Sequence, residues 1–133
     1  MVAGGDGAVY VAGGTEDAEG AFPTDTLYRY DTATDSWSSR APLPVLLQGC
    51  DGVAVEGKIY LPGDGTTADT FVYDMASDYW STIPANNGYS PRSHYKVAAL
   101  GSHVYVVGGI LEDTRTSTTE VWILDTDSGQ WTP

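Results

Sequence analysis

One pattern of aromatic, glycine and acidic residues occurs three times along this chain. In each copy a tyrosine lies in a short apolar stretch, two turn-forming residues follow three positions later, and further on an aspartate precedes a tryptophan by six residues. The three copies are Tyr10, Gly13, Gly14, Asp31 and Trp37; Tyr60, Gly63, Asp64, Asp74 and Trp80; and Tyr105, Gly108, Gly109, Asp125 and Trp131. Successive tyrosines are 50 and then 45 residues apart. A repeat of this length is typical of a unit of about four strands, which is a propeller blade.

Each copy consists of short apolar runs separated by turns. In the third copy, residues 97–100 and 104–107 are joined by Gly101 and Ser102, which is typical of a hairpin. Residues 53–55 and 59–61 repeat this arrangement in the second copy. The paired glycines suit a chain that reverses with positive φ and passes close to a neighbouring backbone. We therefore predict four strands in each copy, the third of which ends at the aspartate.

The stretch from aspartate to tryptophan has its own turn chemistry. An aspartate side chain can accept hydrogen bonds from the backbone amides just ahead of it. Four residues later, each copy has a residue type that tolerates the left-handed conformation: Asp35, Asp78 and Gly129. Three residues before each aspartate there is an aromatic side chain: Tyr28, Phe71 and Trp122. We expect these aromatics to pack against an adjacent blade, and we expect the three repeated tryptophans to be buried at equivalent positions.

Composition limits the possible partners and locations. The 133 residues, one domain in length, include 6 Lys and Arg against 18 Asp and Glu, so the net charge is −12. Such a surface repels nucleic acid and anionic membranes, and we expect neither as a partner. Cys50 is the single cysteine, which excludes an internal disulfide and favours a small core residue. No signal peptide and no bilayer-length apolar run is present, so the default expectation is a cytoplasmic protein.

With these motifs, the chain resembles the kelch-repeat proteins over nearly its whole length. The resemblance implies an all-β fold of three four-stranded β-propeller blades, at about residues 1–44, 45–88 and 89–133. Two departures are visible. Gly63-Asp64 replaces the second glycine pair, and we expect Pro62 to interrupt the preceding strand and give blade 2 an irregular rim. The arginine that often opens a kelch repeat occurs only as Arg92.

Three blades leave the propeller open, because propellers close with about four to eight blades. The apolar faces of the first and last blades would then be exposed. One interpretation is a half-propeller that forms a six-bladed ring as a homodimer, with Tyr28 and Trp122 near the junctions. The other is a piece of a longer propeller protein. We favour the homodimer, because an isolated chain must cover those faces.

The residues that carry chemistry are sparse. The two histidines, His94 and His103, and the single cysteine form no cluster by spacing, so we predict no metal site, no cofactor and no catalytic residues. Galactose oxidase-like propellers use a copper site with two tyrosines, two histidines and a Tyr–Cys crosslink, and this chain cannot match that set. Sialate mutarotase-like propellers offer no motif to compare. A sugar-binding or sugar-active propeller, with exposed aromatics such as Tyr79 and Tyr89, remains the alternative function.

The predicted function is a non-catalytic binding scaffold for a protein or peptide partner. In kelch adaptors the arginine that opens the repeat lies at the channel mouth and contacts acidic partners. The resemblance therefore implies a binding site at Arg92, with Tyr89, His94 and Tyr95 beside it, and with Arg115 in the long loop of the third copy. Arginine suits carboxylate recognition through its planar fork. The competing interpretation is that Arg92 pairs with one of the chain's own acidic residues.

Overall fold

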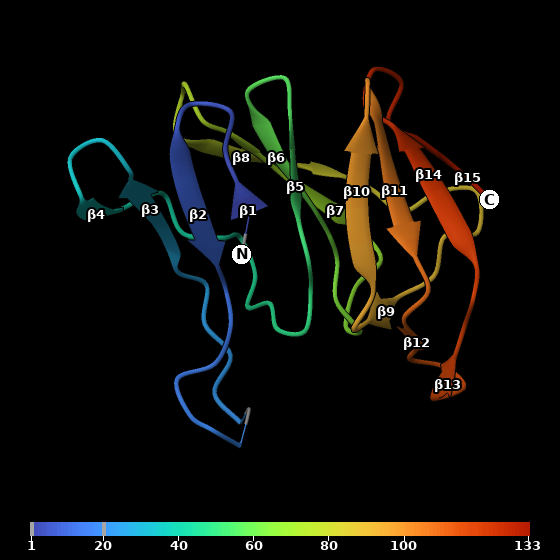
Figure 1. Cartoon of the computed structure of the whole chain (residues 1–133). Helices are drawn as coiled ribbons and strands as arrows, with labels where there is room; N and C mark the ends of the chain where they lie inside the picture. Colours follow the sequence, from blue (N-terminus) through green and yellow to red (C-terminus); the bar gives the residue numbers. More distant parts are fainter. Residues whose placement is uncertain (1, 20) are drawn as a thin grey trace.

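Three four-stranded antiparallel sheets stand side by side in the computed structural model, which describes residues 2–19 and 21–133 (Figure 1). Blade 1 contains β1 (Val2–Ala3), β2 (Ala8–Ala12), β3 (Leu27–Asp31) and β4 (Ser36–Ser39). Blade 2 contains β5 (Val53–Val55), β6 (Lys58–Pro62), β7 (Thr70–Asp74) and β8 (Tyr79–Ile83). Blade 3 contains β10 (Lys96–Leu100), β11 (His103–Val107), β14 (Val121–Asp125) and β15 (Gln130–Thr132). The predicted all-β fold with four strands in each copy is confirmed.

The first strands of the blades line up, with β5 between β1 and β10. A further small sheet, which the sequence did not predict, joins β9 (Arg92–Ser93), β12 (Ile110–Leu111) and β13 (Thr116–Ser117) at one end of blade 3. The described residues contain no helix, and hence none that is long and apolar enough to cross a membrane.

The aspartate turns have the predicted chemistry. Asp31 Oδ1 accepts hydrogen bonds from the backbone amides of Ala33 and Thr34, at 2.9 and 3.1 Å, and Asp74 and Asp125 do the same in their blades. For the last two, these backbone hydrogen bonds lower the pKa of the carboxyl group. The residues four positions later have φ angles of 51°, 54° and 70°, which is the left-handed region.

Each blade presents two different faces, because side chains alternate across a strand. We call the face that carries the repeated tryptophan the Trp face. It consists of Val9, Val11, Tyr28, Tyr30 and Trp37 in blade 1; Ile59, Leu61, Phe71, Tyr73 and Trp80 in blade 2; and Val104, Val106, Trp122, Leu124 and Trp131 in blade 3. We call the opposite face, which carries the repeated tyrosine, the Tyr face.

The core forms where a Tyr face meets the Trp face of the next blade. The first buried cluster joins Val2, Tyr10 and Leu27 of blade 1 to the Trp face of blade 2. The second joins Tyr60 and Val72 of blade 2 to the Trp face of blade 3. Blade 2 is therefore covered on both faces, whereas blade 1 keeps an open Trp face and blade 3 an open Tyr face.

The open faces correct two sequence predictions. The repeated tryptophans were expected to be buried alike, but Trp37 is 59% exposed whereas Trp80 is 8% and Trp131 0% exposed. The difference arises because no blade lies against the Trp face of blade 1. Trp122 was expected near an open junction, but it is buried between blades 2 and 3.

Pro62 does not interrupt its strand. It is the last residue of β6 and pairs with Thr70, where the loss of one N–H donor at a strand end is tolerated. The turn that follows does differ from the other two. Gly63 and Asp64 lack the positive φ angles of the glycine pairs in blades 1 and 3, and Asp64 Oδ1 accepts hydrogen bonds from Thr66 N and Oγ1 instead.

Candidate functional site

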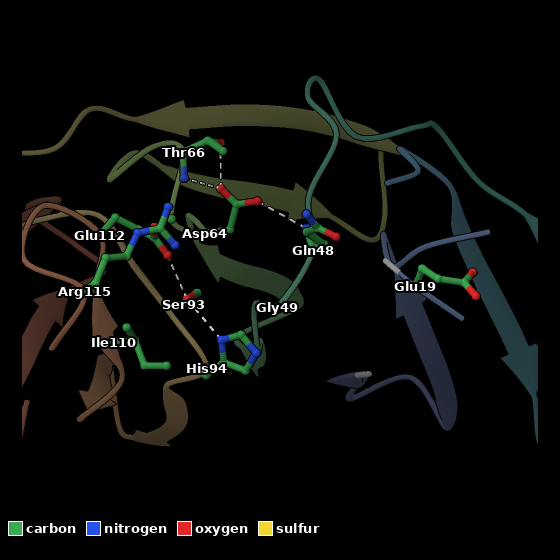
Figure 2. A pocket seen from close by; sticks show the side chains of 11 residues that line it. Glu19, Gln48, Gly49, Asp64, Thr66, Ser93, His94, Ile110, Glu112 and Arg115 are labelled. Carbon is green, nitrogen blue, oxygen red and sulfur yellow. Dashed lines mark hydrogen bonds and ion pairs between the residues drawn. The ribbon is translucent and has the colours of Figure 1, made fainter. Parts of the chain in front are cut away.

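A hollow of about 600 Å³ lies at the end of the blades where the second strands end and the third strands begin. We call it the loop-end hollow. Its lining comes from all three blades and from the two segments that connect them (Figure 2). The lining residues are Glu19, Gln48, Gly49, Asp64, Gly65, Thr66, Ser93, His94, Ile110, Glu112 and Arg115.

Glycines let these segments approach one another closely. The amide of Gly14 donates to the carbonyl of Leu47 at 2.9 Å, and a Cβ at Gly13 would lie 2.5 Å from that carbonyl oxygen. The amide of His94 donates to the carbonyl of Gly49 at 2.8 Å. The predicted role of the glycine pairs, a reversal with close backbone approach, is thus confirmed in blade 1. The hollow is held by backbone hydrogen bonds between neighbouring blades.

A hydrogen-bonded row of side chains crosses the floor of the hollow (Figure 2). Ser93 Oγ donates to Glu112 Oε1 at 3.0 Å, and His94 Nδ1 lies 3.0 Å from Ser93 Oγ. Glu112 Oε2 lies 3.1 Å from Arg115 Nη1. The Arg115 side chain is 79% exposed, so this ion pair contributes little to stability and leaves the guanidinium accessible.

On the blade 2 side, Asp64 fixes the wall of the hollow. Its carboxylate is buried and accepts hydrogen bonds from Gln48 N at 3.2 Å and from Thr66 N at 2.8 Å. The next residue, Gly65, lies under the Glu112 side chain, and a Cβ there would overlap that carboxylate. A larger residue at position 65 would therefore require the Glu112 side chain to move.

The structure divides the five predicted binding residues into two groups. His94 and Arg115 line the hollow. Arg92, Tyr89 and Tyr95 are buried instead, and Arg92 is only 1% exposed. A surface contact between Arg92 and a partner is therefore incompatible with this arrangement.

Arg92 is part of the interior of blade 3. Its Nη2 lies 3.3 Å from Glu120 Oε2, its Nε donates to Ser90 O, and its guanidinium lies over the Tyr89 ring at 5.0 Å. Tyr89 in turn stacks on Trp131 at a centroid distance of 4.0 Å. The competing interpretation, an internal ion pair, describes this arginine.

Tyr95 and Tyr89 also have interior roles. The hydroxyl of Tyr95 donates to the carbonyl of Pro62, which ties blade 3 to blade 2. Because Tyr89 is buried and Tyr79 is exposed, these two aromatics form no shared surface for a sugar ring.

The row Glu112–Ser93–His94 has the wrong order for nucleophilic catalysis. In a serine hydrolase the histidine lies between the acid and the serine. Here the serine lies in the middle and donates a hydrogen bond to the glutamate, so the histidine does not accept the serine proton as it does in a triad. Burial raises the pKa of the Cys50 thiol to about 11, which keeps it protonated near neutral pH. Among residues 2–19 and 21–133, no group of three His, Cys, Asp or Glu is placed to hold a metal ion.

Of the residues that line the hollow, the sequence predicted only His94 and Arg115 as binding residues. Glu19, Gln48 and Glu112 lie in loops without a repeat position, and Asp64 was noted only as a departure from the glycine pair. Two positions in the sequence could have indicated these residues. Asp64 stands where the other copies have the second glycine, and Glu112 follows the glycine pair of the third copy, three residues after Gly109.

Comparison with known proteins agrees with the fold. The chain matches the family described as the KLHDC2/KLHL20/DRC7 Kelch-repeats domain over residues 1–133. It is 28% identical to Kelch-like protein 24 of Rattus norvegicus over 72% of this chain and 16% of that protein. It is 29% identical to Kelch repeat and BTB domain-containing protein 1 of Camelpox virus (strain CMS) over 96% of this chain and 22% of that protein.

A fungal relative is also a kelch-like protein. The chain is 26% identical to Kelch-like protein terF of Aspergillus terreus over 77% of this chain and 25% of that protein. The chain thus spans a quarter or less of the length of these relatives. The repeat motif, the blade topology and the match over all 133 residues agree, and the chain belongs to the kelch-repeat family.

Proposed function

We propose that the chain is a non-catalytic binding scaffold that holds a peptide segment of a protein partner in the loop-end hollow. The observation that carries this proposal is the construction of the hollow from all three blades on a backbone held by inter-blade hydrogen bonds. Binding residues on loops that a rigid scaffold positions are typical of recognition sites. The hollow also exceeds the volume that one or two side chains fill, so it accommodates several residues of an extended segment.

The charges of the hollow define the peptide that fits. Glu19 and Glu112 offer carboxylates, and Arg115, which lies beside Glu112, and His94 offer donors. The net charge of −12 repels acidic chains at long range. We therefore expect a neutral or basic peptide that places one carboxylate or carbonyl near Arg115.

Selection from a random peptide library displayed on phage tests this proposal. We expect the wild-type chain to enrich peptides with a shared motif, and we expect Arg115→Gly combined with His94→Gly to reduce their affinity about tenfold, which corresponds to one lost charge-assisted contact. Glycine is used at both positions because His94 and Arg115 have φ angles of 57° and 55°.

Lys58→Ala provides the matched control, since Lys58 is exposed and begins β6 at the other end of blade 2. The control should leave affinity unchanged. The proposal fails if no peptide is enriched, or if the hollow variant and the control bind the selected peptides as tightly as the wild type.

We further propose that a second copy covers the open faces, which gives a closed ring of six blades. Support comes from the match between the two ends of one chain. The open Tyr face of blade 3 is equivalent to the faces that receive a Trp face at both internal junctions, and blade 1 has an open Trp face. A two-fold ring would use this contact twice and leave no open face. The mass of the chain in solution tests this ring. The alternative is that further blades of a longer polypeptide cover the two open faces.

A further inference from the structure

The junction between blades 1 and 2 contains a specific polar contact to the linker, residues 40–44, that follows β4. Ala41 N donates to Asp78 Oδ1 at 2.9 Å, and Trp80 Nε1 donates to Ala41 O at 2.9 Å. Both backbone groups of one extended residue are thus held by two side chains of the next blade. Tyr73 orients the aspartate, because its hydroxyl donates to the same Oδ1 at 2.7 Å.

Blade 1 has the same three side chains in the same geometry. The hydroxyl of Tyr30 donates to Asp35 Oδ1 at 2.6 Å, as that of Tyr73 does to Asp78. The Tyr30 and Trp37 rings are 5.0 Å apart at 41°, and the Tyr73 and Trp80 rings are 5.0 Å apart at 43°. The arrangement therefore forms without a linker, and in blade 1 no linker lies against it.

The third blade uses a different contact for the same purpose. Gly129 stands at the position of Asp78, and the linker residue Asn86 supplies the side chain instead. Asn86 Oδ1 accepts from Trp131 N at 2.9 Å, and Asn86 Nδ2 donates to Gly129 O at 2.9 Å. The residue in the turn therefore corresponds to the linker that the blade contacts. A turn with an aspartate contacts the backbone of its linker, whereas a turn with a glycine contacts a linker side chain.

We propose that Asp35 and Trp37 form a binding site for the interblade linker of another kelch blade. The occupant is an extended Ala-Pro-Leu type segment, whose first residue donates its N–H to Asp35 and whose carbonyl accepts from the indole N–H of Trp37. The apolar residue two positions later packs on the Trp face, as Leu43 does in the first core cluster. At the equivalent internal junction the first of these hydrogen bonds is exposed and the second is half-buried, so the two polar groups of the occupant become paired at the edge of the apolar contact.

Titration of the chain with a synthetic peptide tests this site separately from the loop-end hollow. The probe is the segment of residues 38–44, acetylated and amidated, and the readout is the indole N–H signals in ¹H–¹⁵N NMR spectra. The titration uses a chain concentration at which the single chain predominates, so that the Trp face of blade 1 is open. We then expect the Trp37 signal to move saturably with a dissociation constant on the order of 1 mM, as suits one short segment. The signals of Trp80 and Trp131, which are already buried, should stay in place.

Two matched probes make the result decisive. The same peptide with N-methylalanine at the position of Ala41 lacks the donated N–H, and the segment of residues 83–89 offers Asn86 instead of the Ala-Pro-Leu pattern. Both peptides should bind the wild-type chain at least tenfold more weakly than the first peptide does. The first peptide should also bind the Asp35→Gly variant at least tenfold more weakly; glycine is chosen because position 35 has a left-handed φ angle. Equal shifts with the N-methyl peptide, or no Trp37 shift at about 10 mM peptide, would overturn the proposal. Neither result bears on peptide binding in the hollow.

Discussion

Blades 1 and 2 carry equivalent aromatic and aliphatic side chains on their Trp faces, but only blade 2 buries them. Trp37 and Trp80 occupy the same register position, each beside the tyrosine of the third strand. Their exposure differs because blade 1 itself covers the Trp face of blade 2, whereas none of the described residues forms a blade over the Trp face of blade 1. In a repeat fold, burial is therefore set by the position of a repeat in the array as much as by its own sequence.

Blade 3 gives the same result for the opposite face. Leu100 is 72% exposed at the position where Val55 of blade 2 is 6% exposed. The molecule thus has a fully covered central blade and two end blades, each with one open face (Figure 1). Substitutions at equivalent positions of different blades should therefore change the free energy of unfolding by different amounts. The difference between them shows how far a neighbouring blade buries each face.

The largest difference is expected at the tryptophans. Trp131→Ala and Trp80→Ala should each lower the free energy of unfolding by about 3–5 kcal/mol, because they empty a packed inter-blade core. Trp37→Ala should cost the dilute single chain less than about 0.5 kcal/mol, as for other surface positions. Urea denaturation monitored by circular dichroism gives these values. Similar losses at Trp37 and Trp80 would show that the Trp face of blade 1 is covered in the single chain.

A second difference is expected on the Tyr face. Val55→Ala should cost about 1.5–2 kcal/mol for two buried methyl groups. Leu100→Ala removes more carbon but should cost less than about 0.5 kcal/mol, because this side chain is mostly in water. The same denaturation experiment at matched concentration compares the two. A larger loss for Leu100 than for Val55 would contradict an open Tyr face in blade 3.

A third difference separates the two turn aspartates. Asp78→Gly leaves the Ala41 amide and the Tyr73 hydroxyl without their acceptor, so it should cost about 1–1.5 kcal/mol. Asp35→Gly removes only the exposed hydrogen bond from the Tyr30 hydroxyl and should cost a few tenths of that amount. Glycine is strain-free in both left-handed turns, and Gly129 is its natural precedent. Thermal unfolding of the two variants gives the comparison, and equal shifts would contradict it.

The smallest effect is a pH dependence at the covered junction. The hydrogen bond from the Ala41 amide, followed by that from the Tyr73 hydroxyl, lowers the pKa of Asp78 below its ordinary value of 3.8. A carboxyl group with a lowered folded pKa stabilises the fold above its unfolded pKa, and this stabilisation is lost as the pH falls through the folded value. Between pH 5 and pH 2, Asp78→Asn should therefore lose less stability than the wild type. Parallel stability profiles in acid denaturation would contradict the role of this carboxylate.

The sequence predicted the repeated parts of the molecule and missed those that depend on neighbours. Asp31 and Asp35 could be placed in their turns because the determinants are local hydrogen bonds and a tolerated φ angle. The burial of Arg92 could not be predicted, since its ion-pair partner Glu120 lies on another segment, 28 residues further along the chain. The exposure of Trp37 was missed because equal spacing was taken to imply equal burial.

The loop-end hollow was predicted only in part for a similar reason. His94 and Arg115 were identified from the kelch resemblance, whereas Glu112 reaches the hollow because a loop of blade 3 lies over Gly65 of blade 2. Contacts between loops of different blades leave no periodic signal in one sequence. A hollow built from such contacts therefore becomes visible only once the blades are placed.

Sedimentation equilibrium of the 133-residue chain tests most directly whether the open faces are covered by a second copy. We predict a folded species with twice the chain mass of 14.1 kDa, and we expect the Trp37→Ala variant to sediment as a single chain instead. Acrylamide quenching should fall as this species forms, because Trp37 is the one tryptophan of the described residues that the single chain exposes. A well-folded species of 14.1 kDa at all concentrations, with Trp37 accessible to quencher, would contradict the closed ring of two chains.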